Sequence, residues 1–250
     1  MSTFHVKRER VDRLLVERGL SPSRTRARAL IEAGKVFADG VQVARTSELF
    51  AAEVVLTVSE LDHPYVSRGG LKLAGALDDL SLDLQGLVVA DIGASTGGFT
   101  DCALSRGAAR VYAIDVGHGQ LHPRLASDPR VIAREGVNAR HLTEESLPER
   151  VDVVLVDASF IGLSKLLPAL VTLLGEHGRL LALVKPQFEV GPEHVGARGV
   201  VSDDTLRAQA LEGVRAAALA LGFCLLGQVD SRLAGPEGNR EIFALFVRVR

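Results

Sequence analysis

Short apolar runs alternate with longer amphipathic stretches along the chain from about residue 70 onward. The short runs predict β-strands at residues 87–92, 110–115, 130–133, 151–156, 178–184, 223–229 and 242–249. The amphipathic stretches predict helices at residues 70–80, 98–106, 162–176 and 204–221. Apolar strands separated by helices are typical of a mostly parallel sheet with helices on both faces. No helix separates the last two strands, which should therefore pair antiparallel. The pattern predicts an α/β, Rossmann-like domain with a seven-stranded sheet.

The part of the chain before this domain has shorter elements. One helix is predicted over about residues 10–18, and a second begins after Ser21 or Ser23, either of which can cap it. Asp39-Gly40, between two short β-forming runs, is a typical hairpin turn. We therefore expect a small N-terminal domain over residues 1–61, a linker over 62–68 and the α/β domain over 69–250.

Charge is distributed unevenly between these two parts. Residues 1–35 contain nine Lys/Arg and four Asp/Glu, although the net charge of the whole chain is −2. A basic module attached to an acidic body is typical of a protein that binds a polyanion. The basic residues of this module that we expect to contact phosphate groups are Arg8, Arg10, Arg24, Arg26, Arg28 and Lys35.

Composition disfavours a membrane or secreted protein. No apolar run reaches the roughly 18 residues that a membrane span needs, and residues 1–8 lack the apolar core of a signal peptide. Cys102 and Cys224 do not have the spacing of metal ligands, and we interpret them as buried free thiols. We predict a cytoplasmic protein without a metal site.

A glycine-rich turn follows the first predicted strand of the α/β domain. Its glycines let backbone N–H groups come close to a ligand. Ser95 occupies the second glycine position of the dinucleotide-binding motif, which disfavours a pyrophosphate and permits S-adenosylmethionine. Asp115 ends the next strand, where an acid can accept hydrogen bonds from ribose hydroxyls, and Asn138 can border the adenine. The candidate cofactor-binding residues are Asp91, Gly93, Ala94, Ser95, Thr96, Gly97, Gly98, Phe99, Asp115, Val116, Asn138 and Asp157.

Four charged residues lie at the ends of predicted elements of this domain. Asp157 and Lys185 each follow a strand, Glu241 precedes the last strand, and Lys72 lies near the start of the first helix. A charge at the edge of a buried strand is costly unless it is paired or used, and ligands bind at the carboxyl edge of such sheets. Methyl transfer to a ribose 2′-hydroxyl needs an oriented nucleophile and a route for its proton. We predict that Lys185 activates or stabilises the attacking oxygen. Asp157 and Lys72 would position that oxygen, and Glu241 would orient the lysines.

These residues resemble known motifs. Lys72, Asp157, Lys185 and Glu241 are similar, in order and context, to the K-D-K-E tetrad of RrmJ/FtsJ-type RNA ribose 2′-O-methyltransferases. Residues 91–101 resemble the cofactor loop of that family, and the N-terminal helices with Gly34-Lys35-Val36 and Gly40 resemble an S4 (α-L) RNA-binding domain. Residues 65–73 and 185–189 are similar to the TlyA family, also called haemolysin A, in which these two domains occur in this order.

The resemblance covers essentially the whole chain and carries further expectations. It implies a class I S-adenosylmethionine-dependent fold and 2′-O-methylation of cytidines in 16S and/or 23S ribosomal RNA within ribosomal subunits. Arg68 would contact RNA, as would Arg198 in residues 191–199, which we predict to form a mobile lid. A flipped nucleotide could stack on Phe160 or Phe188, although both could equally be core residues.

Three other functions are compatible with parts of the pattern. An S4 protein whose second domain has lost its chemistry would be a ribosome assembly factor that binds RNA without turnover. A cytolysin, as the older family name suggests, would need a membrane-active segment that the sequence does not show. A small-molecule methyltransferase would leave the basic N-terminal module unexplained. The sequence leaves the oligomeric state and the modified nucleotide open.

Overall fold

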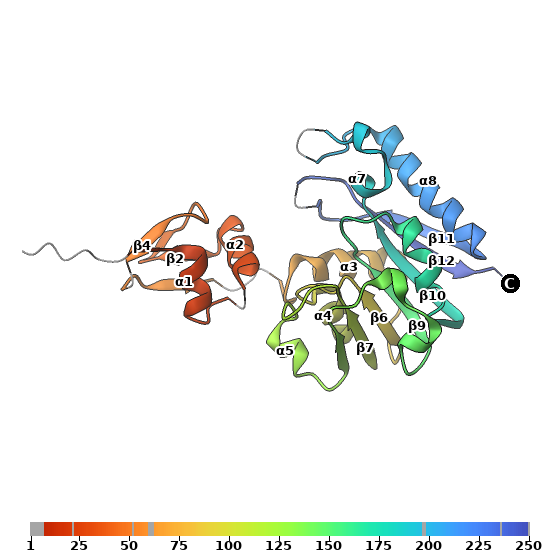
Figure 1. The fold of residues 1–250 in the computed structure, drawn as a ribbon, viewed down its shortest axis with the longest axis horizontal. Helices are drawn as coiled ribbons and strands as arrows, with labels where there is room; N and C mark the ends of the chain where they lie inside the picture. The colour runs from red at the N-terminus through yellow and green to blue at the C-terminus, as the bar shows by residue number, and fades with distance from the viewer. Residues whose placement is uncertain are drawn as a thin grey trace, which may run out of the picture. The chain divides into compact units, whose positions relative to one another are not determined.

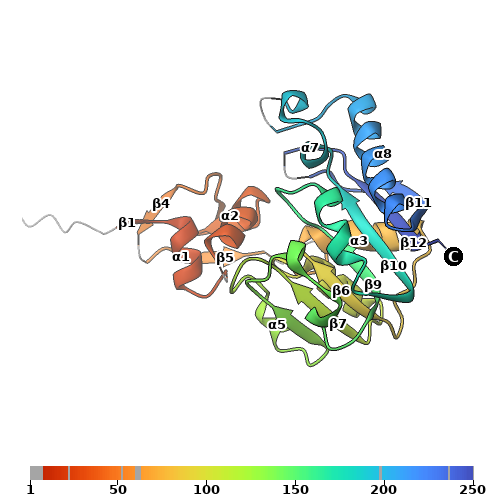
Figure 2. The same cartoon turned by 45° about the vertical axis from the view of Figure 1, so that its right-hand side comes forward.

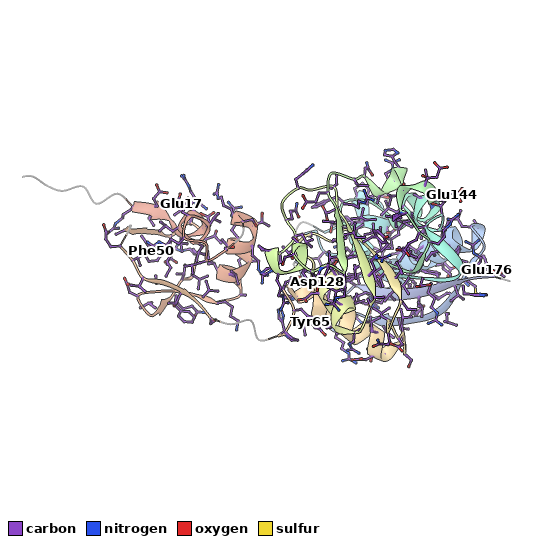
Figure 3. All side chains as sticks on the ribbon, turned by 90° about the horizontal axis from the view of Figure 1, so that it is seen from below. Glu17, Phe50, Tyr65, Asp128, Glu144 and Glu176 are labelled. Atoms are coloured by element: carbon purple, nitrogen blue, oxygen red, sulfur yellow. The ribbon has the colours of Figure 1, made fainter. Side chains whose placement is uncertain are left out.

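The computed structural model of the chain describes residues 8–21, 23–51, 53–59, 63–196, 199–235 and 237–249. Contacts divide the chain into two compact units, Met1–Pro64 and Tyr65–Arg250 (Figures 1 and 2). Glu17 and Phe50 belong to the first unit and Tyr65 begins the second (Figure 3).

The first unit packs two helices against short strands. Its elements are β1 (Arg8–Arg10), α1 (Val11–Glu17), α2 (Arg24–Glu32), β2 (Val36–Ala38), β3 (Val41–Gln42), β4 (Leu49–Ala51) and β5 (Leu56–Val58). Strand β1 pairs with β4, and β2 lies between β3 and β5. The side chain of Ser23 caps α2 by accepting a hydrogen bond from the backbone N of Arg26 at 3.2 Å. Asp39 and Gly40 both have positive φ (48° and 82°), as the predicted two-residue hairpin turn requires.

The second unit is built on one seven-stranded sheet. Its strands are β6 (Val88–Ile92), β7 (Arg110–Ile114), β8 (Val131–Arg134), β9 (Val151–Val156), β10 (Leu174–Val184), β11 (Phe223–Asp230) and β12 (Ile242–Arg248). Their order is β11-β12-β10-β9-β6-β7-β8. Strand β12 is antiparallel to both neighbours, and the other adjacent pairs are parallel. The predicted fold class and the antiparallel pairing of the last two strands are confirmed.

Helices cover both faces of this sheet (Figures 1 and 2). The helices are α3 (Arg68–Asp79), α4 (Gly98–Ser105), α5 (Pro123–Ala126), α6 (Leu167–Leu170), α7 (Pro186–Glu189) and α8 (Asp204–Ala220), with short 3-10 turns η1 (Ala139–His141), η2 (Glu144–Ser146), η3 (Leu163–Lys165) and η4 (Pro192–His194). Successive residues of β9 belong to opposite cores: Val154 packs with residues of α6 and α8, and Leu155 with residues of α3 and α4. Burial on both faces explains why the strands have continuous apolar runs.

The predicted helix over residues 162–176 is wrong. The chain there forms η3 and then the four-residue α6, and β10 already begins at Leu174. Pro168 lies in the first turn of α6, where its missing N–H prevents one continuous helix from forming. The buried leucines of this segment have helical spacing because two short helical turns, rather than one long helix, place them in the core. Within the described residues, no helix is long and apolar enough to cross a bilayer.

Candidate active site

The topology of the sheet brings the four predicted catalytic residues to one edge. Strands β9 and β10 are parallel neighbours, so Asp157 and Lys185, which follow them, lie at the same edge. Strand β12 is antiparallel to β10 with Ile242 opposite Val184, so Glu241 lies at that edge as well. Lys72 reaches it from the second turn of α3.

Two ion pairs connect these residues. Lys72 Nζ lies 2.5 Å from Glu241 Oε2, and Lys185 Nζ lies 2.7 Å from Asp157 Oδ1. The second contact has ion-pair distance but not hydrogen-bond alignment, because Asp157 Oδ1 has no hydrogen-bond partner among the described residues. Lys185 Nζ instead donates its hydrogen bond to Ser159 Oγ at 2.8 Å. Both lysines are 8 % exposed and Glu241 is 1 % exposed, so these charges depend on their partners rather than on water.

All four residues line one cavity of about 580 Å³. Gly93 and Ser95 of the glycine-rich turn line the same cavity, together with the aromatic rings of Phe160 and Phe188. Phe160 is 91 % exposed and has a φ of 65°, and its ring centroid lies 5.5 Å from that of Phe188. The lining of the cavity therefore combines paired charges with two aromatic side chains.

The glycine-rich turn needs its glycines for close packing. Gly93 has a φ of 82°, and a Cβ there would lie 2.7 Å from the backbone oxygen of Asp157. A Cβ on Gly98, the first residue of α4, would lie 2.2 Å from Ser67 Oγ, just before α3. The turn is thereby held against both the Asp157 segment and the start of the helix that carries Lys72. Phe99 points into the core, where its ring stacks on Phe243.

Asp91 lies beneath this turn and is fully buried in β6. Thr100 Oγ1 donates a hydrogen bond to its Oδ2 at 2.6 Å, and its Oδ1 has no hydrogen-bond partner among the described residues. Burial raises the pKa of Asp91 to about 7, with a smaller contribution from the nearby charge of Asp157. A positive charge near this buried carboxyl group would stabilise its ionised form.

The other predicted cofactor residues lie in adjoining loops after β7 and β8. Asp115 accepts hydrogen bonds from the backbone N of Ser95 and of Gly117, at 2.8 and 2.7 Å. The backbone N of Val137 donates a hydrogen bond to the backbone carbonyl oxygen of Asp115 at 2.9 Å. This bond ties the loop after β8 to the loop after β7. Val116 is 69 % exposed, and the side chain of Asn138 accepts a hydrogen bond from the backbone N of Arg140. Ala94 and Thr96 lie within the turn itself.

The predicted RNA-binding residues divide between the two units. Arg68 is exposed at the start of α3, one helical turn before Lys72. In the first unit, Arg10, Arg24 and Arg28 pair with one carboxylate, Asp12. Arg8, Arg26 and Lys35 lie outside this group, and Arg198 lies outside the described residues.

Several residues that support the site were not predicted from the sequence. Ser159 orients Lys185, as described above. Glu189 Oε1 accepts a hydrogen bond from the backbone N of Leu163 at 2.7 Å and so ties the segment after Phe160 to α7. Asn239 is fully buried, accepts from the backbone N of Val201 at 2.9 Å and donates to the oxygen of Gly199 at 2.8 Å. A signal for these roles was present only as polar residues close in sequence to Lys185, Asp157 and Glu241.

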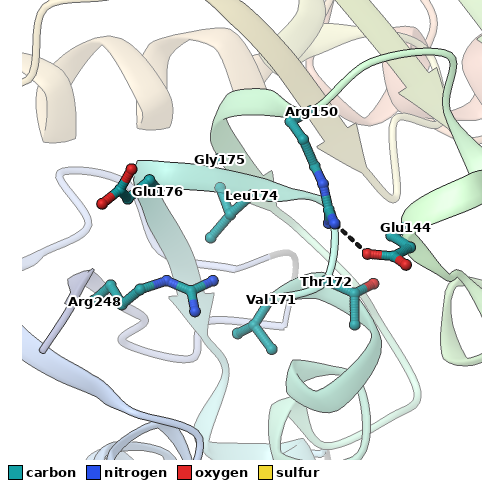
Figure 4. Close-up of a pocket in the computed structure, with 8 residues that line it drawn as sticks. All are labelled: Glu144, Arg150, Val171, Thr172, Leu174, Gly175, Glu176 and Arg248. Carbon is teal, nitrogen blue, oxygen red and sulfur yellow. Dashed lines mark hydrogen bonds and ion pairs between the residues drawn. The ribbon is translucent and has the colours of Figure 1, made fainter.

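A second cavity, of about 540 Å³, lies at the opposite edge of the sheet (Figure 4). Its walls come from the beginnings of β9 and β10 and from the end of the antiparallel β12. Arg150 forms an ion pair with Glu144 there, and Arg248 lies over the ring of Phe223. None of the predicted catalytic or cofactor residues lines it, so it is not the candidate reactive site.

Family models match both units. A model of the FtsJ-like methyltransferase family matches residues 65–248, and a model of the S4 domain matches residues 9–50. The chain is 47% identical, over 95% of its length and 89% of the relative, to the 16S/23S rRNA (cytidine-2′-O)-methyltransferase TlyA of Mycobacterium tuberculosis. It is 42% identical, over 94% of its length and 84% of the relative, to Bacillus subtilis YqxC, which is described as a candidate rRNA methyltransferase.

A solved structure agrees with these matches. The structure of a candidate hemolysin from Streptococcus thermophilus superimposes with a TM-score of 0.77 at 38% identity, covering 98% of this chain and 90% of that one. The fold, the site and the family match thus define the second unit as an FtsJ-like methyltransferase domain. With its S4 domain and its close relatives, the chain belongs to the TlyA (haemolysin A) family.

Proposed function

We propose that this chain transfers a methyl group from S-adenosylmethionine to the ribose 2′-oxygen of cytidines in 16S and/or 23S ribosomal RNA. The observation that carries the proposal is the single cavity lined by Lys72, Asp157, Lys185 and Glu241 together with Gly93 and Ser95. The activity that its Mycobacterium tuberculosis relative is named for supports the same reaction and the same class of substrate.

The cofactor-binding residues fit S-adenosylmethionine. When bound, this cofactor supplies an activated methyl group on a positively charged sulfur. Asp91 has a buried carboxyl oxygen without a hydrogen-bond partner among the described residues, and a positively charged ligand nearby would stabilise its ionised form. Gly93 keeps the backbone open to a close approach. Asp115, Val116 and Asn138 would hold the nucleoside part, with Asp115 facing the ribose hydroxyls. Ala94, Ser95, Thr96, Gly97 and Gly98 would surround the amino-acid part with the backbone of the glycine-rich turn.

The paired charges have separate tasks in this proposal. S-adenosylmethionine would supply the methyl group to the ribose 2′-oxygen, its sulfur would keep the electron pair of the broken bond as a neutral thioether, and the hydroxyl proton would pass to water. Lys185 Nζ, held by Asp157 and Ser159, activates or stabilises the attacking oxygen. Lys72 positions that oxygen from the other side. The ion pair of Glu241 is with Lys72, so Glu241 orients this lysine, while Asp157 and Ser159 orient Lys185.

Binding of the RNA would use both units. The basic residues of the S4 domain and Arg68 at the start of α3 would contact phosphates, which gives affinity without reading sequence. Phe160 offers an exposed ring at the cavity for the base of an extruded nucleotide. Ribosomal subunits present ribosomal RNA in a fixed fold, and recognition by shape suits an S4 domain with few aromatic residues.

The test is transfer of labelled methyl from S-adenosylmethionine to purified 30S and 50S subunits by the wild type and by Lys185→Ala. Label on a ribose 2′-oxygen that is lost in the variant supports the proposal and identifies the subunit. Absence of label on both subunits, while S-adenosylmethionine and RNA still bind, would favour an assembly factor or another RNA.

A further inference from the structure

The S4 domain contains a buried carboxylate surrounded by three arginines. Asp12, in the first turn of α1, has no exposed side-chain area. Arg10 Nε lies 2.9 Å from its Oδ1, and Arg24 Nη2 and Arg28 Nε lie 3.1 and 3.2 Å from its Oδ2. The three arginines come from the end of β1 and from two successive turns of α2. We call Asp12 with Arg10, Arg24 and Arg28 the arginine cluster.

We infer that Asp12 is a positioning residue that holds Arg10, Arg24 and Arg28 at a fixed spacing for RNA phosphates. This inference rests on the proposed binding of ribosomal RNA. It assigns to Asp12 a role opposite to the one its charge suggests, because a carboxylate near a phosphate-binding surface would normally oppose binding.

The geometry explains how one carboxylate can do this. Three guanidinium groups carry three positive charges and would repel one another if they were brought together alone. Asp12 offsets one of these charges and leaves a net excess of about two on the surface of the cluster. The hydrogen bond from Arg10, followed by those from Arg24 and Arg28, holds the pKa of Asp12 well below its usual range. The carboxylate therefore stays ionised under all physiological conditions.

The arginines still present donors to a ligand. Their side chains are 37 %, 52 % and 50 % exposed, while the carboxylate lies beneath them. Each guanidinium has five N–H donors, of which Arg24 and Arg28 each use one on Asp12 and Arg10 uses two. The remaining N–H donors belong to guanidinium groups that are already held in place. Less side-chain conformational entropy is therefore lost when they bind phosphates.

The ligand class follows from the shape and charge of the cluster. Three planar guanidinium groups held around one carboxylate can contact several phosphate oxygens of a folded RNA backbone at once. They suit such a backbone better than one isolated anion. Arg8 and Lys35 belong to the same unit and add to its number of basic residues. The cluster is therefore a preorganised contact for the RNA backbone, with Asp12 acting through the arginines rather than touching RNA.

Asp12→Asn distinguishes this role from simple electrostatics. The change keeps the shape of the side chain and makes the net charge one unit more positive, so a count of charges predicts tighter binding of RNA. If Asp12 positions the arginines, the variant should bind RNA more weakly, because the arginines lose their common ionic partner. The matched control is Glu17→Gln on the same helix α1, which changes the charge equally at a side chain that is 53 % exposed (Figure 3).

The experiment measures the Kd of the full chain for purified 30S and 50S subunits over a series of salt concentrations. We expect Asp12→Asn to raise Kd by roughly ten-fold or more and to make the salt dependence shallower, and Glu17→Gln to leave Kd unchanged or lower it. Under single-turnover conditions, saturating subunits should restore the methyl-transfer rate of Asp12→Asn, which a loss of folded protein would not allow.

Circular dichroism and the thermal midpoint check that the variant folds. If Asp12→Asn does not fold, the double variant Arg24→Lys/Arg28→Lys replaces it: positioned forks predict weaker binding although every charge is kept. If the tested variant binds the subunits as tightly as the wild type or more tightly, the inference is wrong, while the proposal that the chain binds RNA still stands. Failure of the wild type to bind either subunit overturns the proposed function as well.

Discussion

Lys72 Nζ and Glu241 Oε2 lie 2.5 Å apart although 169 residues separate them in the chain. Lys72 belongs to the first helix of the methyltransferase domain, and Glu241 immediately precedes its last strand. The pair can therefore form only when the antiparallel β12 has entered the sheet beside β10. The candidate catalytic site is therefore complete only when the last strand has joined the sheet.

The first prediction separates the stability of this pair from its catalytic role. Lys72→Met leaves the buried Glu241 without its partner and should lower the free energy of unfolding by about 3–5 kcal/mol. Lys72→Met/Glu241→Gln removes both charges and should recover much of that loss. Both variants should lack methyl transfer, because neither restores the charge that positions the ribose oxygen. Urea unfolding and labelled-methyl transfer measure the two effects.

A surface pair provides the control for this comparison. Arg215 and Glu212 on α8 form an ion pair with side chains 50 % and 59 % exposed. Arg215→Met should change the free energy of unfolding by only about 0–1 kcal/mol, because water replaces the partner, and transfer should continue. A Lys72→Met protein that still transfers methyl groups, or a double variant as unstable as the single one, would contradict this account.

The second prediction concerns the pH dependence of stability. Burial raises the pKa of Asp91 to about 7, above its value in the unfolded chain. The native protein therefore holds a proton that the unfolded chain releases from about pH 4 upward, so the free energy of unfolding falls until the pH reaches about 7. Compared with Asp91→Asn, which cannot titrate, the wild type should lose roughly 4 kcal/mol across this window. Urea unfolding at several pH values measures the difference, and parallel pH profiles for the two proteins would disprove it.

The sequence contained enough information to place the strands and the four charged residues. The strands are short, buried on both faces and separated by helices, so their apolar runs are distinct. Asp157 and Lys185 follow such runs directly, and parallel topology then requires them to share an edge. The predicted helix over residues 162–176 is absent: buried leucines keep helical spacing across two short turns interrupted at Pro168. Hydrophobic periodicity indicates which side chains are buried. It does not indicate whether they belong to one continuous helix.

The sequence does not show which residues pair with the charged residues. In the sequence, Asp12 is one of four acidic residues in the basic segment 1–35, whereas in the structure three arginines converge on it. Its partners Arg24 and Arg28 lie 12 and 16 residues away, and helix packing rather than local spacing brings them together. Ser159 and Asn239 are equally ordinary in sequence, because their roles depend on loops whose positions only the assembled sheet defines.

The third prediction separates RNA binding from chemistry. Arg24→Ala/Arg28→Ala should weaken binding to ribosomal subunits and lower the slope of log K against log salt by roughly one unit per lost phosphate contact. Lys185→Ala should leave this binding and its salt slope unchanged while abolishing transfer. Filter binding over a salt series and transfer at saturating subunits measure the two properties. If both variants lose the same property, the two units do not divide the work in this way.

The fourth prediction concerns the loop beside the cavity. Asn239 is buried and holds Gly199 and Val201 through its side chain, and Gly199 lines the cavity. Asn239→Ala leaves a backbone N–H and a carbonyl without that partner, which should cost about 1–3 kcal/mol of stability. The loosened loop should raise KM for the subunits, while the Kd for S-adenosylmethionine should stay close to that of the wild type, because Gly93 and Asp115 remain in place. Steady-state kinetics and calorimetric titration of the cofactor test this, and a KM equal to that of the wild type would show that the loop does not contact the RNA.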